Sequence, residues 1–242
     1  MANQSILIIG MGGLGVPAAC ALARGGAARL GLVDFDSVAL SNLPRQVIYG
    51  ISSLGRLKVE AAAERLRKDY PGVAVATYPV ALDAANAADL IGRHGFVIDA
   101  TDDPASKFLI NDVCVALQRP FVYAGVLGMS GQAMTVIPGR TACLRCLFEE
   151  PPAPGEIASC REAGIIGPVA AAIGEVEAAE ALRWLRGTEP ELAGRILTYD
   201  AGAGATLRTL AVSVRAQCRC ARAPGIGPSA AEAAAREHTT NH

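Results

Sequence analysis

The stretch Ser5-Ile6-Leu7-Ile8-Ile9-Gly10-Met11-Gly12-Gly13-Leu14-Gly15 decides the fold of this 242-residue chain. A short, branched apolar run that ends in glycine is typical of a buried parallel strand. The alanine-rich residues that follow, 14–24, have the composition of a helix. Glycines in the turn allow the backbone to approach a phosphate, and the start of the helix supplies N–H donors and partial positive charge. The stretch therefore predicts a nucleotide-binding turn between a strand and a helix.

Strands and helices alternate outward from this turn. Further buried or alternating strands are expected at 29–33, 73–78, 96–98 and 120–123. Helices are expected at 14–24, 52–70 and about 104–117. This is the spacing of β-α-β units, so we predict an α/β, Rossmann-like and mainly parallel sheet with helices on both faces. Beyond it, strands at 132–137, 195–199 and 205–214 and a long helix at 167–185 predict an antiparallel extension.

Composition excludes several classes of protein. The chain is 51% hydrophobic and 19% charged, with a net charge of −1, so it is neither disordered nor attractive to nucleic acid or anionic membranes. No apolar run approaches the ~20 residues that span a bilayer, and no basic leader precedes the first strand. We therefore expect a soluble, cytoplasmic protein. A single domain is predicted over 1–220, divided into a nucleotide-binding half at about 1–130 and a second half at about 131–220, with a flexible tail at 221–242.

An acidic residue at the end of the second strand completes the nucleotide signal. Asp34 follows the apolar run 29–33. A carboxylate there is placed to bind ribose hydroxyls. The alternative is a plain tight turn without a ligand, and the combination of strand, glycines, helix and acid argues against it. The loop and Asp34 fit an adenine dinucleotide and ATP equally well.

Charged residues farther along favour ATP over a dinucleotide. Arg45 offers a fork of donors suited to phosphate oxygens, with Asn42 three residues before it, and Lys58 adds a second positive charge. Asp102 and Asp103 follow the strand 96–98, where ligands bind in open α/β sheets, and a carboxylate there can hold Mg²⁺. Each residue alone could be a solvated charge, or a helix cap in the case of Asp102. Together they predict a site for ATP with Mg²⁺.

The seven cysteines are expected to be reduced, and four of them form two close pairs. Cys143 and Cys146 form a C-x-x-C, and Cys218 and Cys220 form a tighter C-x-C. Four thiolates can make a closed structural Zn²⁺ site, and unmetallated thiols are the alternative. Cys160 stands alone in a polar loop beside Arg161, where a lowered pKa would make it nucleophilic, although the spacing alone favours an inert loop cysteine.

Taken in series, these residues resemble the ThiF/MoeB/HesA family, the bacterial relatives of ubiquitin-activating enzymes, over about residues 5–220. The motifs that carry the resemblance are Gly-x-Gly-Gly-Leu-Gly, Asp34-x-Asp36, Ser41-Asn42-Leu43-x-Arg45-Gln46, Lys58, Ala100-Thr101-Asp102, the paired cysteines, Cys160-x-x-Ala-Gly, Gly167-Pro168 and Glu180-Ala181. The second cysteine pair departs from the family's C-x-x-C. Asp103 and Lys107 stand where Asn and Arg are common, and Lys is not equivalent to Arg at a bidentate site.

The resemblance implies an ATP-dependent adenylyltransferase. Such an enzyme adenylates the C-terminal glycine of a small ubiquitin-like sulfur carrier of the ThiS or MoaD type and releases pyrophosphate. The product is the activated form that leads to a thiocarboxylate in thiamine, molybdopterin or related biosynthesis. The implied partners are a carrier ending in Gly-Gly, a separate sulfur donor of the cysteine desulfurase or rhodanese type, and a second copy of the chain.

By position, the family's roles pass to individual residues. The loop glycines would meet the phosphates, Asp34 the ribose, and Asn42, Arg45 and Lys58 the triphosphate charge. Asp102 would hold Mg²⁺, and Cys160 matches a crossover-loop cysteine that joins the carrier covalently in some members. The implied nucleotide set is Gly10, Gly12, Gly13, Gly15, Asp34, Asp36, Ser41, Asn42, Arg45, Lys58, Asp102 and Asp103.

Two other functions stay open. An NAD(P)-dependent oxidoreductase shares the glycine loop and Asp34 but gives no role to Arg45, Lys58 or the four paired cysteines. A non-catalytic subunit of the same family is also compatible with the fold, although intact Arg45, Lys58 and Asp102 argue against it.

Overall fold

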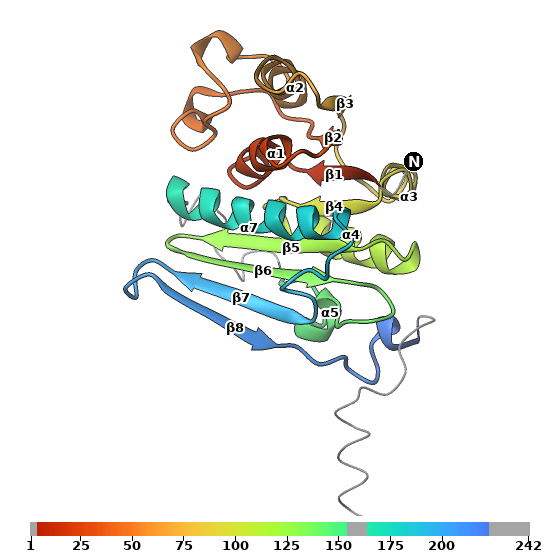
Figure 1. Cartoon of the computed structure of the whole chain (residues 1–242). Helices are drawn as coiled ribbons and strands as arrows, with labels where there is room; N and C mark the ends of the chain where they lie inside the picture. The colour runs from red at the N-terminus through yellow and green to blue at the C-terminus, as the bar shows by residue number, and fades with distance from the viewer. Residues whose placement is uncertain (1–3, 154–163, 223–242) are drawn as a thin grey trace, which may run out of the picture.

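The computed structural model describes residues 4–153 and 164–222. Its eight strands form one sheet in the order β3-β2-β1-β4-β5-β6-β7-β8 (Figure 1). The parallel strands are β1 (Ser5–Ile9), β2 (Arg29–Val33), β3 (Ala74–Tyr78), β4 (Phe96–Asp99) and β5 (Phe121–Leu127). The antiparallel strands are β6 (Ser130–Val136), β7 (Arg195–Asp200) and β8 (Thr206–Ala211). The predicted Rossmann-like sheet with an antiparallel extension is confirmed.

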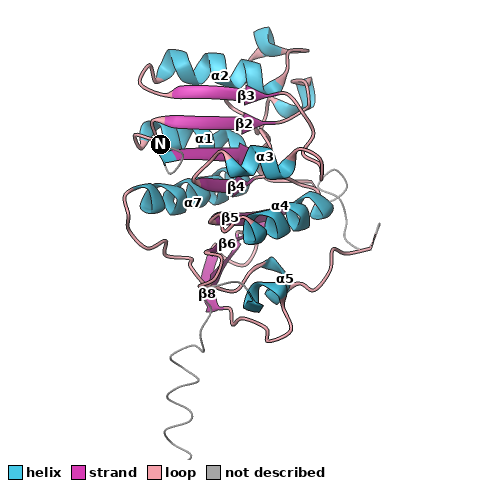
Figure 2. Ribbon diagram, turned by 90° about the vertical axis from the view of Figure 1, so that its right-hand side faces the viewer, coloured by secondary structure: helices cyan, strands magenta, loops and turns pink. Residues whose placement is uncertain are grey.

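Helices cover both faces of the sheet (Figure 2). One face carries α1 (Gly15–Arg24), α2 (Lys58–Asp69) and α7 (Gly167–Leu185). The other carries α3 (Ala87–Gly92), α4 (Pro104–Ala116) and α5 (Leu144–Leu147). Short 3₁₀ turns lie at Leu40–Asn42, Ile51–Ser53 and Arg219–Arg222. No helix in the described part of the chain is both long and apolar enough to cross a membrane.

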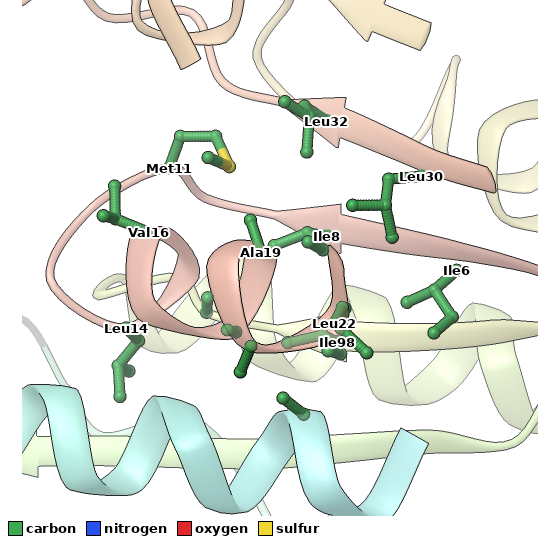
Figure 3. Packing of buried hydrophobic residues seen from close by; sticks show 14 of the residues in the cluster. Ile6, Ile8, Met11, Leu14, Val16, Ala19, Leu22, Leu30, Leu32 and Ile98 are labelled. Carbon is green, nitrogen blue, oxygen red and sulfur yellow. The ribbon is translucent and has the colours of Figure 1, made fainter. Parts of the chain in front are cut away.

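Strand β1 is buried on both faces, as its continuous apolar run predicts. Ile6 and Ile8 belong to the core under α1 and α7, whereas Leu7 and Ile9 belong to the core under α3 and α4. This alternation follows from the two-residue period of a strand. Figure 3 shows Ala19 and Leu22 of α1 beside the strands on the first of these faces.

Helices α1 and α7 approach closely because of a small residue at their contact. A Cβ built on Gly174 of α7 would lie 2.5 Å from the carbonyl oxygen of Leu14. A side chain at this position would therefore push the two helices apart. The contact matters for the site, because Leu14 belongs to the glycine loop.

The helix predicted at 52–70 begins six residues later, at Lys58. Gly55 has a positive φ of 78°, and Leu57 is extended and forms an isolated β-bridge with Ser37. The bridge pairs the two ends of the long segment between β2 and α2 and keeps Leu57 extended, so the helix starts only after Leu57. Helices α3 and α5 are too short, at six and four residues, to give a clear periodic pattern.

Candidate functional site

The glycine loop lies at the carboxyl ends of the parallel strands, where it links β1, β2 and β4. The Gly10 N–H donates to the Val33 carbonyl (2.8 Å), and the Ala100 N–H donates to the Ile9 carbonyl (2.9 Å). The ends of β1, β2 and β4 are therefore held together, and the segments that follow them meet at one place. This is the edge at which open α/β sheets bind ligands.

The four glycines of the loop fall into two pairs with different physical reasons. Gly10 has φ +97°, and a Cβ on it would lie 2.6 Å from the Ala100 carbonyl oxygen. A Cβ on Gly15 would overlap the carbonyl oxygen of Gly10. Fold geometry alone requires glycine at these two positions. Gly12 and Gly13 have no such conflict, since their nearest neighbours would be 3.8 and 3.4 Å from a Cβ.

Gly12 and Gly13 are therefore the two glycines that a close-lying ligand explains. Both are only partly buried, and they directly precede the amino terminus of α1. Without side chains, the backbone is open to a phosphate group at this helix start.

Asp34 supports the glycine loop with one carboxylate oxygen and the following turn with the other. Its Oδ2 accepts the Met11 N–H at 2.7 Å, and its Oδ1 accepts the Asp36 N–H at 2.8 Å. Burial of the side chain raises the pKa of Asp34, and the charge of Lys58 opposes that rise. Each carboxylate oxygen keeps a second lone pair, so the carboxylate can still accept a hydroxyl.

Lys58 is a buried cation held by two acidic residues. Its Nζ lies 2.7 Å from Asp36 Oδ2 and 3.9 Å from Asp34 Oδ2, and its side chain is 7% exposed against 49% for Asp36. The Lys58 N–H also donates to the Asp36 carbonyl at 2.9 Å. The start of α2 thus places an ammonium group beside the glycine loop.

The segment between β2 and α2 carries the second cation. Asn42 Oδ1 accepts the Ala39 N–H (3.0 Å) and closes a short turn, and Arg45 Nη1 donates to the Ser41 carbonyl (2.8 Å). A Cβ on Gly13 would lie 3.9 Å from Arg45 Cδ. The guanidinium therefore extends from beside the glycine loop and has only one hydrogen bond within the described residues.

Two further residues, neither of them among the predicted nucleotide-binding residues, lie against the loop. The Tyr49 hydroxyl donates to the Met11 carbonyl at 3.0 Å. Gln46 is 2% exposed, its Oε1 has no partner within the described residues, and its Nε2 would lie 3.8 Å from a Cβ on Gly12. Gln46 belongs to the quoted Ser-Asn-Leu-x-Arg-Gln motif, so a signal was present, whereas Tyr49 had none.

The two aspartates after β4 have different surroundings. Asp103 is the N-cap of α4, where its Oδ2 accepts the N–H and the hydroxyl of Ser106, both at 2.8 Å. Asp102 is exposed and has no hydrogen bond or ion pair within residues 4–153 and 164–222. Asp102 is therefore the carboxylate of the two that remains available to a cation.

The four paired cysteines lie close together on the face of the sheet that α3, α4 and α5 cover. Their sulfur atoms all lie within 4.8 Å of one another, and the closest pairs are Cys146–Cys220 and Cys218–Cys220 at 3.4 Å and Cys143–Cys218 at 3.5 Å. Tetrahedral Zn²⁺ with Zn–S bonds of about 2.3 Å places its sulfurs about 3.8 Å apart. The sulfur atoms of the C-x-C pair are therefore as close to the spacing of a tetrahedral zinc site as those of the C-x-x-C pair.

The neighbouring thiols change one another's tendency to ionise. Interaction with Cys143 lowers the pKa of Cys146, and the interaction with Cys146 raises the pKa of Cys143 to about 12. Without a cation, a second thiolate would be repelled by the first, and this cost is what a bound metal removes. The donor set fits Zn²⁺. Cys160 lies outside the described residues.

A family model described as the ThiF family matches residues 1–221. A sulfur carrier protein adenylyltransferase of Thermus thermophilus is 39% identical over 221 residues, which cover 89% of this chain and 81% of that protein. The adenylyltransferase and sulfurtransferase MOCS3 of Sus scrofa is 38% identical over 227 residues, 93% of this chain and 50% of that protein. The chain thus spans about half the length of this second relative.

Solved structures show the same fold. Escherichia coli MccB with ATP aligns with a TM-score of 0.78 and 19% identity, over 90% of this chain and 66% of that chain. MccB with MccA-N7isoASN aligns with a TM-score of 0.80 at 19% identity, over 90% of this chain and 67% of that chain. At this level of identity the likeness concerns the fold.

Proposed function

The chain belongs to the ThiF family, and from that premise we propose that it adenylates the C-terminal carboxylate of a small ubiquitin-like sulfur-carrier protein. The reaction consumes ATP and releases pyrophosphate. The observation that carries the proposal is the convergence of two open glycines, Gly12 and Gly13, with two cations, Lys58 and Arg45, at one edge of the sheet. A nicotinamide enzyme needs no such pair of cations, so the oxidoreductase alternative is set aside.

The chemistry requires little acid or base work. A carboxylate is already ionised at neutral pH and attacks the α-phosphorus atom directly, so the enzyme must align the two reactants and stabilise negative charge. Lys58 and Arg45 supply positive charge to the phosphate oxygens, and the backbone at Gly12 and Gly13 supplies donors. Asp34 binds the ribose. The Ser41 carbonyl positions Arg45 by accepting its hydrogen bond, and Asn42 closes the short turn that contains Ser41.

Two metals belong to the proposal. Asp102 is the residue that would hold Mg²⁺, which neutralises charge on the triphosphate when bound. Cys143, Cys146, Cys218 and Cys220 would hold one structural Zn²⁺. Both assignments rest on the donor atoms described above.

Exposed apolar side chains suggest where the two protein partners bind. Ile51, Val47, Leu40 and Phe35 are 78%, 76%, 69% and 64% exposed, and all lie in the segment between β2 and α2 that also carries Arg45. We assign this segment to the interface of a homodimer, because several large apolar side chains exposed on one segment favour a protein contact. Figure 1 shows the segment projecting past the sheet at the site edge.

A second exposed apolar cluster lies at the turns of the antiparallel strands. Leu127 and Met129 frame the β5–β6 turn, Ile166 is bonded to it through its N–H and the Gly128 carbonyl (3.2 Å), and Leu207 is 62% exposed beside the β7–β8 turn. We assign this cluster to the carrier, since it faces the same edge as the glycine loop. The sulfur donor would be a separate protein of the cysteine desulfurase or rhodanese type.

The test is ATP–pyrophosphate exchange with and without each candidate carrier that ends in Gly-Gly. Exchange that appears with one carrier, and disappears when its terminal glycine is deleted, supports adenylation of that glycine and identifies the pathway. Exchange that is independent of every carrier, or absent with all of them, contradicts the proposal.

A further inference from the structure

A buried ion pair lies directly behind the segment that carries Asp102. Lys107 Nζ is 3.3 Å from Asp99 Oδ1, and the side chains of Lys107 and Asp99 are 11% and 0% exposed. Asp99 is the last residue of β4, and Lys107 lies at the end of the first turn of α4, so the pair spans residues 100–106, which include Asp102. An ion pair this deep is costly to maintain unless both ions are well positioned.

Lys107 is fixed by two further contacts from β5. Its Nζ donates to the Ala124 carbonyl at 2.5 Å and lies 5.2 Å from the centre of the Tyr123 ring. Gln132 in turn donates to the Tyr123 hydroxyl at 2.5 Å. The ammonium group is therefore held by residues of β5 on one side and forms an ion pair with Asp99 on the other.

Asp99 also fixes the turn that follows β4, through hydrogen bonds to Thr101. The same Oδ1 that meets Lys107 also accepts the Thr101 hydroxyl at 2.6 Å and the Thr101 N–H at 3.2 Å. Thr101 directly precedes Asp102. On the other side of Asp102, Asp103 is committed to capping α4. Among the residues that the structure describes, Asp102 is thus a carboxylate without a partner between two residues whose side chains are both hydrogen-bonded.

We infer that Lys107 and Asp99 are positioning residues that hold Asp102, through Thr101, where its carboxylate can meet the cation of ATP. The inference rests on the proposed function in that Asp102 serves Mg²⁺. The geometry of the turn itself is independent of that role. Neither Lys107 nor Asp99 touches the nucleotide in this assignment.

Four variants separate positioning from general stability. Thr101→Val keeps the shape of the side chain but removes the hydroxyl bond to Asp99, whereas Thr101→Ser keeps that bond. Lys107→Met removes the charge that balances Asp99. Ile110→Ala, a buried apolar change on the same helix α4, lowers stability without touching residues 99–103 and serves as the control.

Two measurements are made on the purified chain. Hydrogen–deuterium exchange of residues 99–107 without ligand reports the order of the turn. Calorimetry of ATP binding, with Mg²⁺ and with EDTA, reports the metal-dependent part of the affinity. We expect Thr101→Val and Lys107→Met to raise the exchange of this segment severalfold and to remove most of the Mg²⁺-dependent gain in affinity. Thr101→Ser and Ile110→Ala should leave both near the wild-type values, and affinity with EDTA should change little in all four.

Unchanged exchange and an unchanged Mg²⁺ gain in Thr101→Val and Lys107→Met would overturn the inference. An equal effect of Ile110→Ala would also overturn it, because the loss would then be general. If the wild-type protein binds ATP equally with Mg²⁺ and EDTA, the metal role of Asp102 in the proposed function fails. In that case the exchange of the turn alone decides whether Lys107 and Asp99 order it.

Discussion

The ammonium group of Lys58 lies 2.7 Å from the carboxylate of Asp36, and only 7% of the lysine side chain is exposed. A lysine held in this way cannot move far, so its charge is present before ATP arrives, and catalysis by charge stabilisation depends on such preorganisation. We expect Lys58→Met to lower ATP–pyrophosphate exchange by about 10²–10³-fold. It should also lower the free energy of unfolding by about 1–3 kcal/mol, because Asp34 and Asp36 lose their partner. Exchange assays and thermal denaturation measure the two effects. Lys68→Met, at an exposed position of the same helix, should change neither.

Arg45 offers a cleaner separation of function from stability. Its guanidinium makes one hydrogen bond in the described structure, to the Ser41 carbonyl, and the side chain is not in the core. Arg45→Ala should therefore reduce exchange at least about 10²-fold while the midpoint of thermal unfolding moves little. Arg45→Lys should restore only part of the activity, since lysine lacks the planar fork that grips two phosphate oxygens. Full activity of Arg45→Ala would remove this residue from the nucleotide site.

The glycine loop predicts a contrast between two substitutions of the same chemistry. Gly10→Ala meets the Ala100 carbonyl at 2.6 Å and a positive φ, so this variant should be strongly destabilised. Gly12→Ala has 3.8 Å of room and an ordinary φ, so it should fold like the wild type. Its methyl group would still occupy the space that a phosphate needs, and we expect ATP affinity to fall about tenfold or more. Calorimetry and thermal denaturation of both variants test the contrast, and normal ATP affinity in Gly12→Ala would show that no ligand approaches there.

The strands, the glycine loop and Asp34 could be predicted because their signals are local. A continuous apolar run followed by glycines indicates a buried strand and a turn wherever it occurs. The pairing of Lys58 with Asp36, and of Lys107 with Asp99, could not be predicted in this way, because each pair is formed by segments that only the fold brings together. The same is true of the late start of α2 at Lys58, which depends on the bridge between Ser37 and Leu57.

The four clustered cysteines predict one zinc ion per chain. Cys218→Ala removes one thiolate from the site, and we expect metal analysis to find less than one zinc and the free energy of unfolding to fall by several kcal/mol, at about the scale of a lost structural metal. Cys20→Ala, on the half-buried surface of α1, is the matched control and should keep its zinc. A wild-type chain without zinc, or one whose thermal stability is unaffected by a strong chelator, would exclude the metal site.

Glu177 predicts how stability changes with pH. The side chain is 0% exposed, and neither carboxylate oxygen has a partner in the described part of the molecule. Burial raises the pKa of Glu177 well above its ordinary value, with Lys107 opposing the rise and Asp99 adding to it. A folded-state pKa above that of the unfolded chain means that the folded protein retains a proton that the unfolded protein loses. Its stabilising contribution is then complete below the unfolded pKa and disappears as the pH rises towards the folded pKa.

Replacement by glutamine removes this titration while keeping the size of the side chain. The free energy of unfolding of Glu177→Gln, relative to the wild type, should therefore increase by about 1.4 kcal/mol per pH unit above the unfolded pKa, until the folded pKa is reached. Urea denaturation at pH 5, 6, 7 and 8 measures the difference. Glu175→Gln is the matched control, because Glu175 on the same helix is exposed and pairs with Arg24 at the surface, where an ion pair contributes little. A difference between Glu177→Gln and the wild type that stays constant from pH 5 to pH 8 would mean that Glu177 holds no proton in the folded protein.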